Sequence, residues 1–273
     1  MNEYPYHIPV LSSPDLGLFR APGPGLGNLL FPISRALIGQ RANGGTFVFP
    51  TIRQIKIGPY LRREPDKRTY GDIFRSRSMF ENRLWLRSLF LAKSAEGASA
   101  GMNNIGITYS GLGRQFHDLN DAGPLLSRYF QNISRVPVPA IDYDIAVHIR
   151  RGDFSLPAEG ANVQNMQIEL DWYKQAVGAA KNIIGNSSPR IIVFSDSNPA
   201  SIIDELGFSN AQAEPDGNAL TSMLIMAQAR VLVGSRSTFS LWGQFFGDTI
   251  GIWPKDYQLH RYKPIDLNKD HFV

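Results

Sequence analysis

The sequence predicts an α/β protein with two Rossmann-like domains, whose parallel sheets face a cleft. Three observations lead to this prediction. In the second half of the chain, short apolar runs rich in β-branched residues alternate with helical patterns, which is typical of a doubly wound parallel sheet. In the first half, the glycine-rich turn GPGLGN opens an apolar helical segment. Between the halves, the prolines of VPVPAIDYD exclude a helix interior and indicate a boundary, giving domains 1–140 and 141–273.

The elements of the second half follow from apolar runs and helix-capping residues. Strands are predicted at Ile145–Ile149, Ile191–Phe194, Val231–Val233 and Thr249–Trp253. A helix beginning at Trp172 has Asp171 as its expected cap, and another has Asn198 as cap, Pro199 at its first position and Gly207 after its end. Further helices are predicted at Leu220–Ala229 and after Ser237.

The first half has a weaker pattern. Leu18–Ala21 is expected as a strand before the glycine turn, and Leu29–Ile38 as the helix after it. Phe47–Phe49 and Ile105–Tyr109 are expected as further strands. An irregular arginine-rich insertion separates them, over about residues 55–100. We interpret this half as a second Rossmann-like unit.

Composition excludes several classes of protein. With 273 residues, 43% hydrophobic and 19% charged, the chain can bury a substantial core. Because it has no cysteine, disulfides, thiolate metal sites and a cysteine nucleophile are excluded. The N-terminus lacks the pattern of a signal peptide, and no run reaches the roughly 18 apolar residues of a membrane span. We therefore expect a cytoplasmic protein, with peripheral contact to the inner face of a membrane as an alternative.

The net charge of +4 favours an anionic ligand but is too small to indicate nucleic acid. The basic excess concentrates in residues 60–93, which contain nine Lys and Arg residues and only four acidic residues. This segment is either a solvated helical face or a contact surface for an anionic acceptor or a lipid surface. No stable protein partner is implied.

The heptapeptide HIRRGDF, residues 148–154, follows the predicted strand Ile145–Ile149 directly. Ligands of open α/β sheets bind outside the carboxyl ends of the strands. Because side chains alternate along a strand, His148 and Arg150 share one face, whereas Arg151 points elsewhere, toward a carboxylate within the fold. Arg150 therefore suits an anionic ligand. The alternatives are that both arginines form structural ion pairs, or that Arg-Gly-Asp is an adhesion tripeptide in a chain without an export signal.

Three other motifs adjoin strand ends. Ser237, Thr238 and Phe239 open a helix, where backbone N–H groups attract anions, although simple capping explains the serine equally well. Asp196 in Ser-Asp-Ser follows another strand; its carboxylate can accept two N–H groups of guanine, or cap the next turn. The turn containing Gly25, Gly27 and Asn28 departs from the dinucleotide-binding glycine pattern, and we interpret it as backbone surface facing the cleft.

Asp142 and Asp144 have the Asp-x-Asp spacing that metal-dependent glycosyltransferases use. They precede the strand and so lie at its amino end, away from the expected site. We interpret them as part of a solvated turn. No other cluster of His, Asp and Glu has metal-ligand spacing, and no metal is expected.

Taken in order, these motifs resemble those of α1,2-fucosyltransferases and, more distantly, of α1,6- and protein O-fucosyltransferases. HIRRGDF is similar to the His-x-Arg-Arg-x-Asp-aromatic signature, and GLGNLLFPISRAL to an N-terminal Gly-x-x-Gly-Asn segment. VFSDS, DWYKQAV and MLIMAQARVLVGSRSTFSLW resemble further motifs, so that the likeness spans about residues 20–40 and 140–246. Four positions depart from the family pattern: Ser222, Ala227, Arg236 and Leu241 stand where Asp, Ser, Asn and Trp are usual.

The resemblance implies a GT-B-like, inverting, metal-independent transferase with no cofactor and with GDP-fucose as donor. On that basis Arg150 holds the β-phosphate, His148 supports it, and Ser237, Thr238 and Phe239 contact phosphate. Asp196 reads the guanine, while Gly25, Gly27 and Asn28 line the donor side of the cleft. Asp153 and Glu159 are the candidates for the catalytic base. The partners are then a nucleotide sugar and a glycan acceptor, with α1,2 linkage in surface polysaccharide or oligosaccharide synthesis.

Two alternatives remain open. The chain could use another nucleotide sugar, such as GDP-mannose. It could also be a non-catalytic sugar- or nucleotide-binding protein on a degenerate transferase scaffold, an alternative that Ser222 and Arg236 favour.

Overall fold

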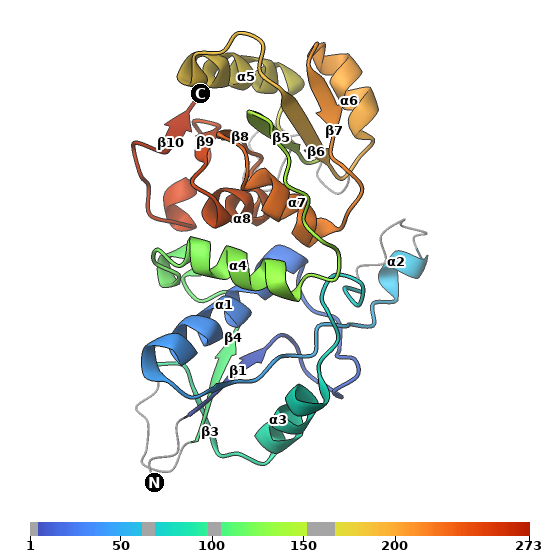
Figure 1. Cartoon of the computed structure of the whole chain (residues 1–273), viewed down its shortest axis with the longest axis vertical. Coiled ribbons are helices and arrows are strands. Elements are labelled where there is room, and N and C mark those ends of the chain that lie inside the picture. Colours follow the sequence, from blue (N-terminus) through green and yellow to red (C-terminus); the bar gives the residue numbers. More distant parts are fainter. Residues whose placement is uncertain (1–4, 62–68, 98–104, 152–166) are drawn as a thin grey trace. The chain divides into compact units, whose positions relative to one another are not determined.

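The computed structural model describes residues 5–61, 69–97, 105–151 and 167–273. The chain divides into two compact units, each built on one parallel sheet (Figure 1). Unit 1 comprises Met1–Ala122 and Ile133–Arg135, and unit 2 comprises Gly123–Asn132 and Val136–Val273. The predicted fold class, α/β with two Rossmann-like units, is confirmed. The cleft between the units stays a prediction.

Unit 2 contains a six-stranded sheet in the order β10-β9-β8-β5-β6-β7, with every pair parallel. Its strands are β5 (Ile145–Ile149), β6 (Ile191–Ser195), β7 (Ala211–Ala213), β8 (Val231–Val233), β9 (Ile250–Trp253) and β10 (Asp270–Phe272). Numbered one to six in chain order from β5, the strands lie in the order 3-2-1-4-5-6 when the sheet is read from β7 to β10. That order is the one found in dinucleotide-binding folds.

The helices of unit 2 are α4 (Gly123–Ile133), α5 (Leu170–Ile184), α6 (Pro199–Leu206), α7 (Ala219–Met226) and α8 (Thr238–Phe246), followed by a short 3-10 helix at Leu259–Arg261. Helices α5 to α8 cover the two faces of the sheet, and α4 packs outside them against α8 (Figure 1). One face of the sheet packs Ile145 and Val147 against Tyr173 and Ala176 of α5 and Ile202 of α6. The opposite face lies over α7 and α8, which Figure 1 shows on the other side of the strands.

The four predicted strands of the second half are confirmed as β5, β6, β8 and β9, whereas the edge strands β7 and β10 were not predicted, and some helix ends differ. Asn198 caps α6 by accepting the N–H of Ala200, and Gly207 closes this helix in the left-handed region, as predicted. The cap predicted for α5 is wrong: Glu169 is the N-cap, while Asp171 lies in the first turn and pairs with Lys174. A carboxylate there still favours the positive end of the helix dipole. Helix α7 is also shorter than the predicted Leu220–Ala229.

Unit 1 contains a four-stranded parallel sheet in the order β2-β1-β4-β3. Its strands are β1 (Tyr6–Val10), β2 (Thr46–Phe47), β3 (Lys93–Ala95) and β4 (Gly106–Ser110); its helices are α1 (Leu26–Asn43), α2 (Gly58–Leu61) and α3 (Met79–Leu89), with a 3-10 turn at Gln115–Asp118. Helix α1 packs against β1 and β4. Leu84 and Trp85 of α3 pack against Tyr6 and Ile8, whose side chains alternate with that of His7 along β1.

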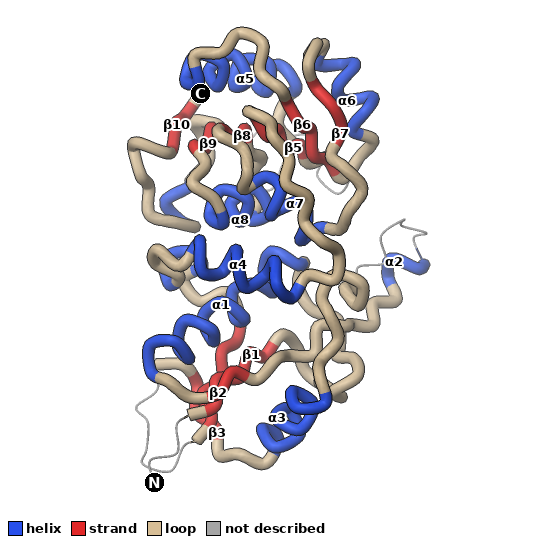
Figure 2. Tube along the Cα trace, viewed as in Figure 1, coloured by secondary structure: helices blue, strands red, loops and turns tan. Residues whose placement is uncertain are grey.

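Two expectations for unit 1 are wrong. Leu18–Ala21 is not a strand, because only single bridges join Arg20 to Asp15 and Gln54, and this part of the chain is loop (Figure 2). The strand before the glycine turn is β1, whose pattern was not recognised because it contains Pro9. Proline has no N–H to donate to a neighbouring strand, and it is tolerated here because β2 pairs only with Tyr6 and His7. Helix α1 also exceeds the predicted Leu29–Ile38 at both ends.

The arginine-rich insertion is more regular than predicted. It contains α3, which starts with a capping box: Ser78 accepts the N–H of Glu81, and Glu81 accepts the N–H of Ser78. Glu81 also pairs with Arg75 at 2.7 Å, and this hydrogen-bonded arginine holds the pKa of Glu81 down at about 2. The start of α3 therefore follows from a sequence signature, Ser-Met-Phe-Glu.

Candidate functional site

The sheet of unit 2 reverses its strand order between β5 and β8, which are neighbours. From β5 the chain builds outward through β6 and β7, and from β8 it builds in the other direction. In doubly wound sheets, ligands bind outside the carboxyl ends of the strands at this reversal. The residues at the ends of β5 and β8 are His148, Arg150 and the segment Gly234–Ser240. The topology therefore brings together two motifs that lie almost ninety residues apart.

His148 joins these two strand ends. Its side chain is buried, and its Nδ1 lies 2.6 Å from Oγ of Ser240 and 3.0 Å from Oγ of Ser235. Its ring stacks on Phe239, with ring centroids 5.0 Å apart. The Oγ of Ser240 also accepts the N–H of Ser235 at 3.0 Å. His148 therefore fixes the start of α8 against the end of β5, a contact that the motif spacing alone did not reveal.

Burial and the neighbouring Arg150 charge lower the pKa of His148 to about 3, with burial the larger cause. The imidazole is therefore neutral at physiological pH. A neutral ring suits a positioning role better than direct charge pairing with a phosphate.

This depressed pKa predicts a pH-dependent stability. Between about pH 6.5 and 3 the unfolded chain protonates His148 whereas the folded protein does not, so the free energy of unfolding decreases as pH falls through this window. We expect wild type to lose about 2 kcal/mol more than His148→Gln between pH 6.5 and 5, at about 1.4 kcal/mol per pH unit. Urea unfolding at both pH values measures this difference. Equal losses in the two proteins would contradict it.

Arg150 and Asp196 lie together at the ends of β5 and β6. Nε of Arg150 is 3.0 Å from Oδ2 of Asp196, and Oδ1 of Asp196 accepts the backbone N–H of Arg151 at 2.8 Å. Both side chains are partly exposed, at 22% for Arg150 and 31% for Asp196. Arg151 reaches Glu205 of α6 at 3.4 Å, which confirms the expectation that it turns toward a carboxylate of the fold. The two arginines therefore have different surroundings.

The start of α8 lies beside this pair of strands. Ser237 is its N-cap, as predicted, and its Oγ accepts the N–H of Phe239 at 3.2 Å. Thr238 is the first helical residue. The N-terminus of a helix carries positive partial charge, and Arg150 adds a full positive charge at the end of β5. This edge of the sheet is therefore suited to an anion.

Two of the departures from the family pattern have clear local roles. Arg236 is buried and pairs with Asp256, with Nη2 2.6 Å from both carboxylate oxygens. Ser222 donates to Glu214 at 2.5 Å, and burial raises the pKa of this glutamate. Glu214, which follows β7, is thus a second carboxylate at the carboxyl edge of the sheet. Sequence reasoning missed it because it belongs to no motif.

Asp142 and Asp144 lie at the amino end of β5, as predicted. Asp142 pairs with Arg190 at 2.5 Å, and Asp144 accepts the backbone N–H of Arg190 and lies 3.7 Å from Arg230. Between them, Tyr143 is buried and donates to the carbonyl of Ile225. Within the described ranges, no group of three or more His, Cys, Asp or Glu residues could hold a metal ion.

Gly25, Gly27 and Asn28 lie at the start of α1 in unit 1. Gly25 is the N-cap in an extended conformation, and its carbonyl accepts the N–H groups of Asn28 and Leu29. A Cβ atom at Gly25 would meet nothing within 4 Å, so this glycine leaves open surface at the helix start. That these residues share a site with Arg150 stays a prediction. The candidate bases Asp153 and Glu159 lie outside the described residues.

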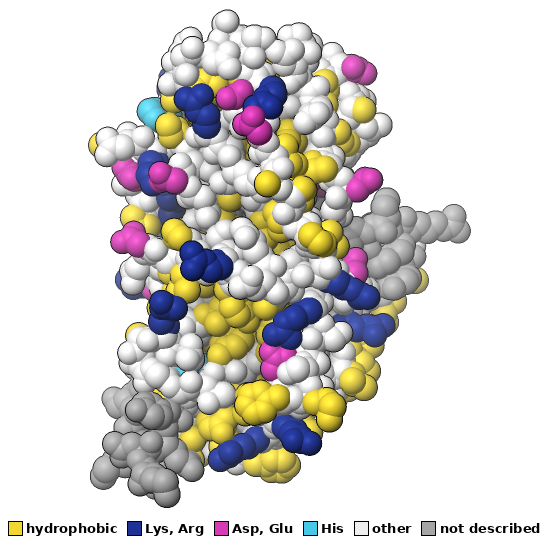
Figure 3. All heavy atoms as spheres, in the orientation of Figure 1, with side chains coloured by type: hydrophobic (Ala, Val, Ile, Leu, Met, Phe, Trp, Pro, Cys, Tyr) yellow, Lys and Arg dark blue, Asp and Glu magenta, His cyan; other side chains and the backbone are white. Residues whose placement is uncertain are grey.

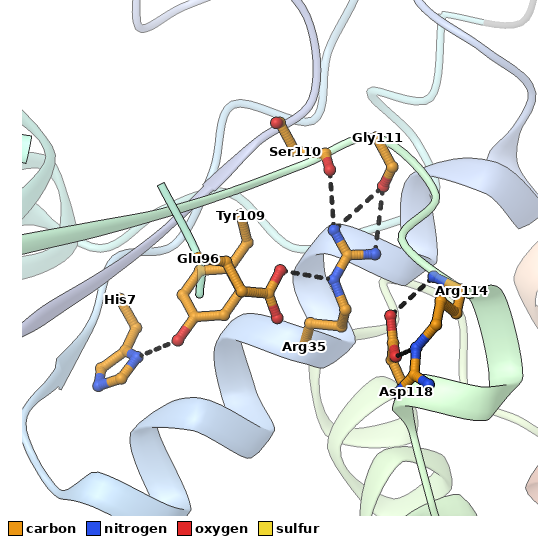
Figure 4. A network of polar contacts seen from close by, with 8 residues as sticks. All are labelled: His7, Arg35, Glu96, Tyr109, Ser110, Gly111, Arg114 and Asp118. Carbon is orange, nitrogen blue, oxygen red and sulfur yellow. Dashed lines mark hydrogen bonds and ion pairs between the residues drawn. The ribbon is translucent and has the colours of Figure 1, made fainter. Parts of the chain in front are cut away.

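Unit 1 contains two polar pockets that sequence reasoning did not find. The first, of about 270 Å³, lies beside α1 and β4. Within it Arg35 pairs with Glu96 at 2.9 Å and donates to the carbonyls of Ser110 and Gly111, while Oη of Tyr109 lies 2.8 Å from Nδ1 of His7 (Figure 4). Every polar group in this network has a partner inside unit 1, so its clearest role is to hold α1 on the sheet.

The second pocket, of about 350 Å³, has four arginines among its lining residues: Arg53, Arg75, Arg77 and Arg135. We call it the arginine pocket. Arg135 donates to the carbonyl of Gly71, while the aliphatic stem of Arg53 lies against the same glycine. The guanidinium of Arg77 stacks over Trp85 and donates to the carbonyl of Gly17, and its Nη1 is buried without a hydrogen-bond partner among the described residues. The pocket is therefore positive, although Glu81 neutralises Arg75.

Solved fucosyltransferase structures resemble the chain in their fold. The structure of POFUT1 in complex with GDP has a TM-score of 0.49 and 15% identity, and the match covers 91% of this chain and 96% of that chain. The NodZ alpha-1,6-fucosyltransferase soaked with GDP-fucose gives 0.45 and 15%, over 90% and 93%, and NodZ from Bradyrhizobium gives 0.46 and 14%, over 90% and 94%. No protein-family model and no curated protein matched. At these values the likenesses concern fold alone, and we base no conclusion about activity on them.

Proposed function

We propose that this protein is an inverting, metal-independent glycosyltransferase that moves fucose from GDP-fucose to a hydroxyl group of a glycan, with α1,2 linkage. The observation that carries the proposal is the meeting of His148 and Arg150 with the Ser235–Ser240 segment at the strand reversal of unit 2. This arrangement supports diphosphate binding because a guanidinium and a helix N-terminus adjoin the place where such sheets bind ligands. The resemblance of the ordered motifs to fucosyltransferases supports the identity of the donor.

In the proposed reaction the acceptor hydroxyl displaces GDP directly at the anomeric carbon, through an oxocarbenium-like transition state. Negative charge develops on the departing diphosphate. Arg150 and the positive N-terminal end of α8 at Ser237 and Thr238 stabilise that charge, because they are already oriented by the fold. His148 positions these groups through Ser240 and Phe239 rather than exchanging a proton.

Asp196 has a double role in this proposal. Its carboxylate orients Arg150 and accepts the backbone N–H of Arg151, and its remaining acceptor capacity receives the guanine N–H groups. Gly25, Gly27 and Asn28 line the donor site from unit 1. Asp153 or Glu159 accepts the proton of the acceptor hydroxyl.

Calorimetric titration with GDP and UDP tests nucleotide binding. We expect GDP to bind more tightly than UDP, and EDTA to leave GDP affinity unchanged, because Arg150 and the α8 start supply the positive charge. Preference for UDP, or loss of binding in EDTA, would contradict the proposal.

Release of GDP from GDP-fucose and GDP-mannose, measured over a panel of glycan acceptors, separates the remaining alternatives. Turnover of GDP-mannose alone would replace the proposed donor. Tight GDP binding with no turnover on any acceptor would favour a non-catalytic binding protein. Arg236, paired with Asp256, and Ser222, bonded to Glu214, are the departures from the family pattern that favour this alternative.

A further inference from the structure

Helix α3 exposes large apolar side chains on the side that faces away from the sheet. Its inner side packs Leu84 and Trp85 against the sheet of unit 1, and Ser88 is buried. The outward side chains are much more exposed: Met79 76%, Phe80 67%, Leu86 52%, Leu89 47% and Phe90, the C-cap, 89%. The outer faces of helices in globular proteins are normally polar. Five large exposed hydrophobic residues on one short helix therefore require an explanation.

Basic residues occur among these apolar ones. At about 100° per residue, Arg83 lies within roughly 60° of Met79, Leu86 and Phe90 around the helix axis. Arg87, one turn further on, is also exposed, and its guanidinium lies over the ring of Tyr6, 5.5 Å from the ring centroid. Figure 3 shows hydrophobic and basic side chains mixed over the part of the molecule where Figure 1 places α3. The one acid of the helix, Glu81, lies toward the inner side and pairs with Arg75. We call this set, Met79, Phe80, Arg83, Leu86, Arg87, Leu89 and Phe90, the α3 face.

The surroundings of α3 extend this chemistry. The arginine pocket lies beside the start of the helix and includes Asn82 in its wall. The loop of Gly17 lies against the ring of Trp85 and carries Leu16 and Leu18, which are 60% and 82% exposed. Apolar and positive groups thus adjoin one another on this side of unit 1.

We propose that the α3 face docks on the surface of a bilayer that contains anionic phospholipids. Its apolar side chains enter the boundary between headgroups and acyl chains, while Arg83 extends its stem to headgroup phosphates and Arg87 binds them with the N–H groups of the guanidinium that lies over Tyr6. A bilayer fits better than a second copy of the chain, because two α3 faces in contact would bring positive charges together without an acid between them. Among the described residues no helix is long and apolar enough to span a membrane, so the contact is peripheral.

Sedimentation of the full chain with lipid vesicles tests this proposal. We expect binding to vesicles of phosphatidylcholine mixed with phosphatidylglycerol, weaker binding to phosphatidylcholine alone, and loss of binding at high salt. The double variant Phe80→Glu with Phe90→Glu should bind at least about tenfold more weakly, because it removes apolar burial and adds repulsion. Arg83→Gln with Arg87→Gln should lose about tenfold on the anionic vesicles and little on the neutral ones.

Leu267→Glu is the matched control, because Leu267 is a leucine of unit 2, outside the α3 face, that is 82% exposed. It should bind vesicles as wild type does, and unchanged thermal unfolding midpoints should show that all variants fold. The proposal fails if wild type does not bind anionic vesicles, or if Phe80→Glu with Phe90→Glu binds as well as wild type. It also fails if light scattering shows a dimer that this double variant converts to a monomer. None of these outcomes depends on the proposed transferase activity.

Discussion

Replacing Arg150 by alanine should lower the turnover of GDP-fucose by about 100–1000-fold, the usual loss when one preoriented group that stabilises developing charge is removed. Among the described residues of the candidate site, Arg150 combines a full positive charge, partial exposure and a carboxylate that orients it. Arg150→Lys should also be strongly impaired, because lysine keeps the charge but lacks the planar fork that matches a phosphate. The rate of GDP release under saturating donor measures both effects.

The adjacent arginine provides the control for this prediction. Arg151 pairs with Glu205 of α6 and contacts the site only through its backbone N–H, which survives substitution. Arg151→Ala should therefore stay within a few-fold of wild-type turnover. If Arg150→Ala behaved like Arg151→Ala, Arg150 could not be the group that holds the diphosphate.

Replacing Asp270 by alanine should lower the free energy of unfolding by about 3–5 kcal/mol, the usual consequence of breaking a buried ion pair from one side. The fully buried carboxylate of Asp270 lies 2.6 Å from Nζ of Lys263. It also accepts from Gln244, from the backbone of Asp266 and from the indole N–H of Trp253. Removing it leaves the lysine charge and several buried donors without their acceptor, which chemical denaturation would detect.

An exposed ion pair at the same end of the sheet serves as a control that shows how much of the effect on stability comes from burial. Asp248 is 89% exposed and pairs with Lys269 at the surface. Exposed pairs of this kind contribute little, so Asp248→Ala should change the free energy of unfolding by less than about 1 kcal/mol. Similar losses for the two variants would show that burial of Asp270 is not what makes its ion pair important.

The sequence predicted unit 2 better than unit 1 for a physical reason. The four inner strands of unit 2, β5, β6, β8 and β9, are short apolar runs with a strand on each side, and residues such as Asn198 and Ser237 cap the helices that follow. The edge strands β7 and β10 carry polar residues, and the sequence pattern did not reveal them. In unit 1 the central strand β1 contains His7 and Pro9, so its apolar pattern is broken, and β2 has only two residues. Tertiary packing rather than local pattern defines those strands.

The same contrast applies to the candidate site. Strand alternation predicted that His148 and Arg151 would point in different directions, and the structure confirms this. The roles of Ser235 and Glu214 could not be inferred, because a hydroxyl or carboxylate becomes part of a site only when the fold brings distant segments together. A serine spaced five residues before Ser240 was the single available signal for Ser235, and serine is too common for that spacing to be informative.

The division of the chain between the units has a consequence for how the halves depend on each other. Helix α4 precedes the proline-rich boundary, yet its residues Gly123–Asn132 belong to unit 2, where Phe130 packs against Trp242 and Phe246. The next residues, Ile133–Arg135, belong to unit 1, where their backbone groups form hydrogen bonds with those of Ile73 and Arg75. From Val136 to the last residue the chain belongs to unit 2. A protease cut within 136–144 would therefore not release two independent domains. The amino-terminal fragment would keep a helix that the carboxyl-terminal fragment needs, and the two pieces would remain associated through it.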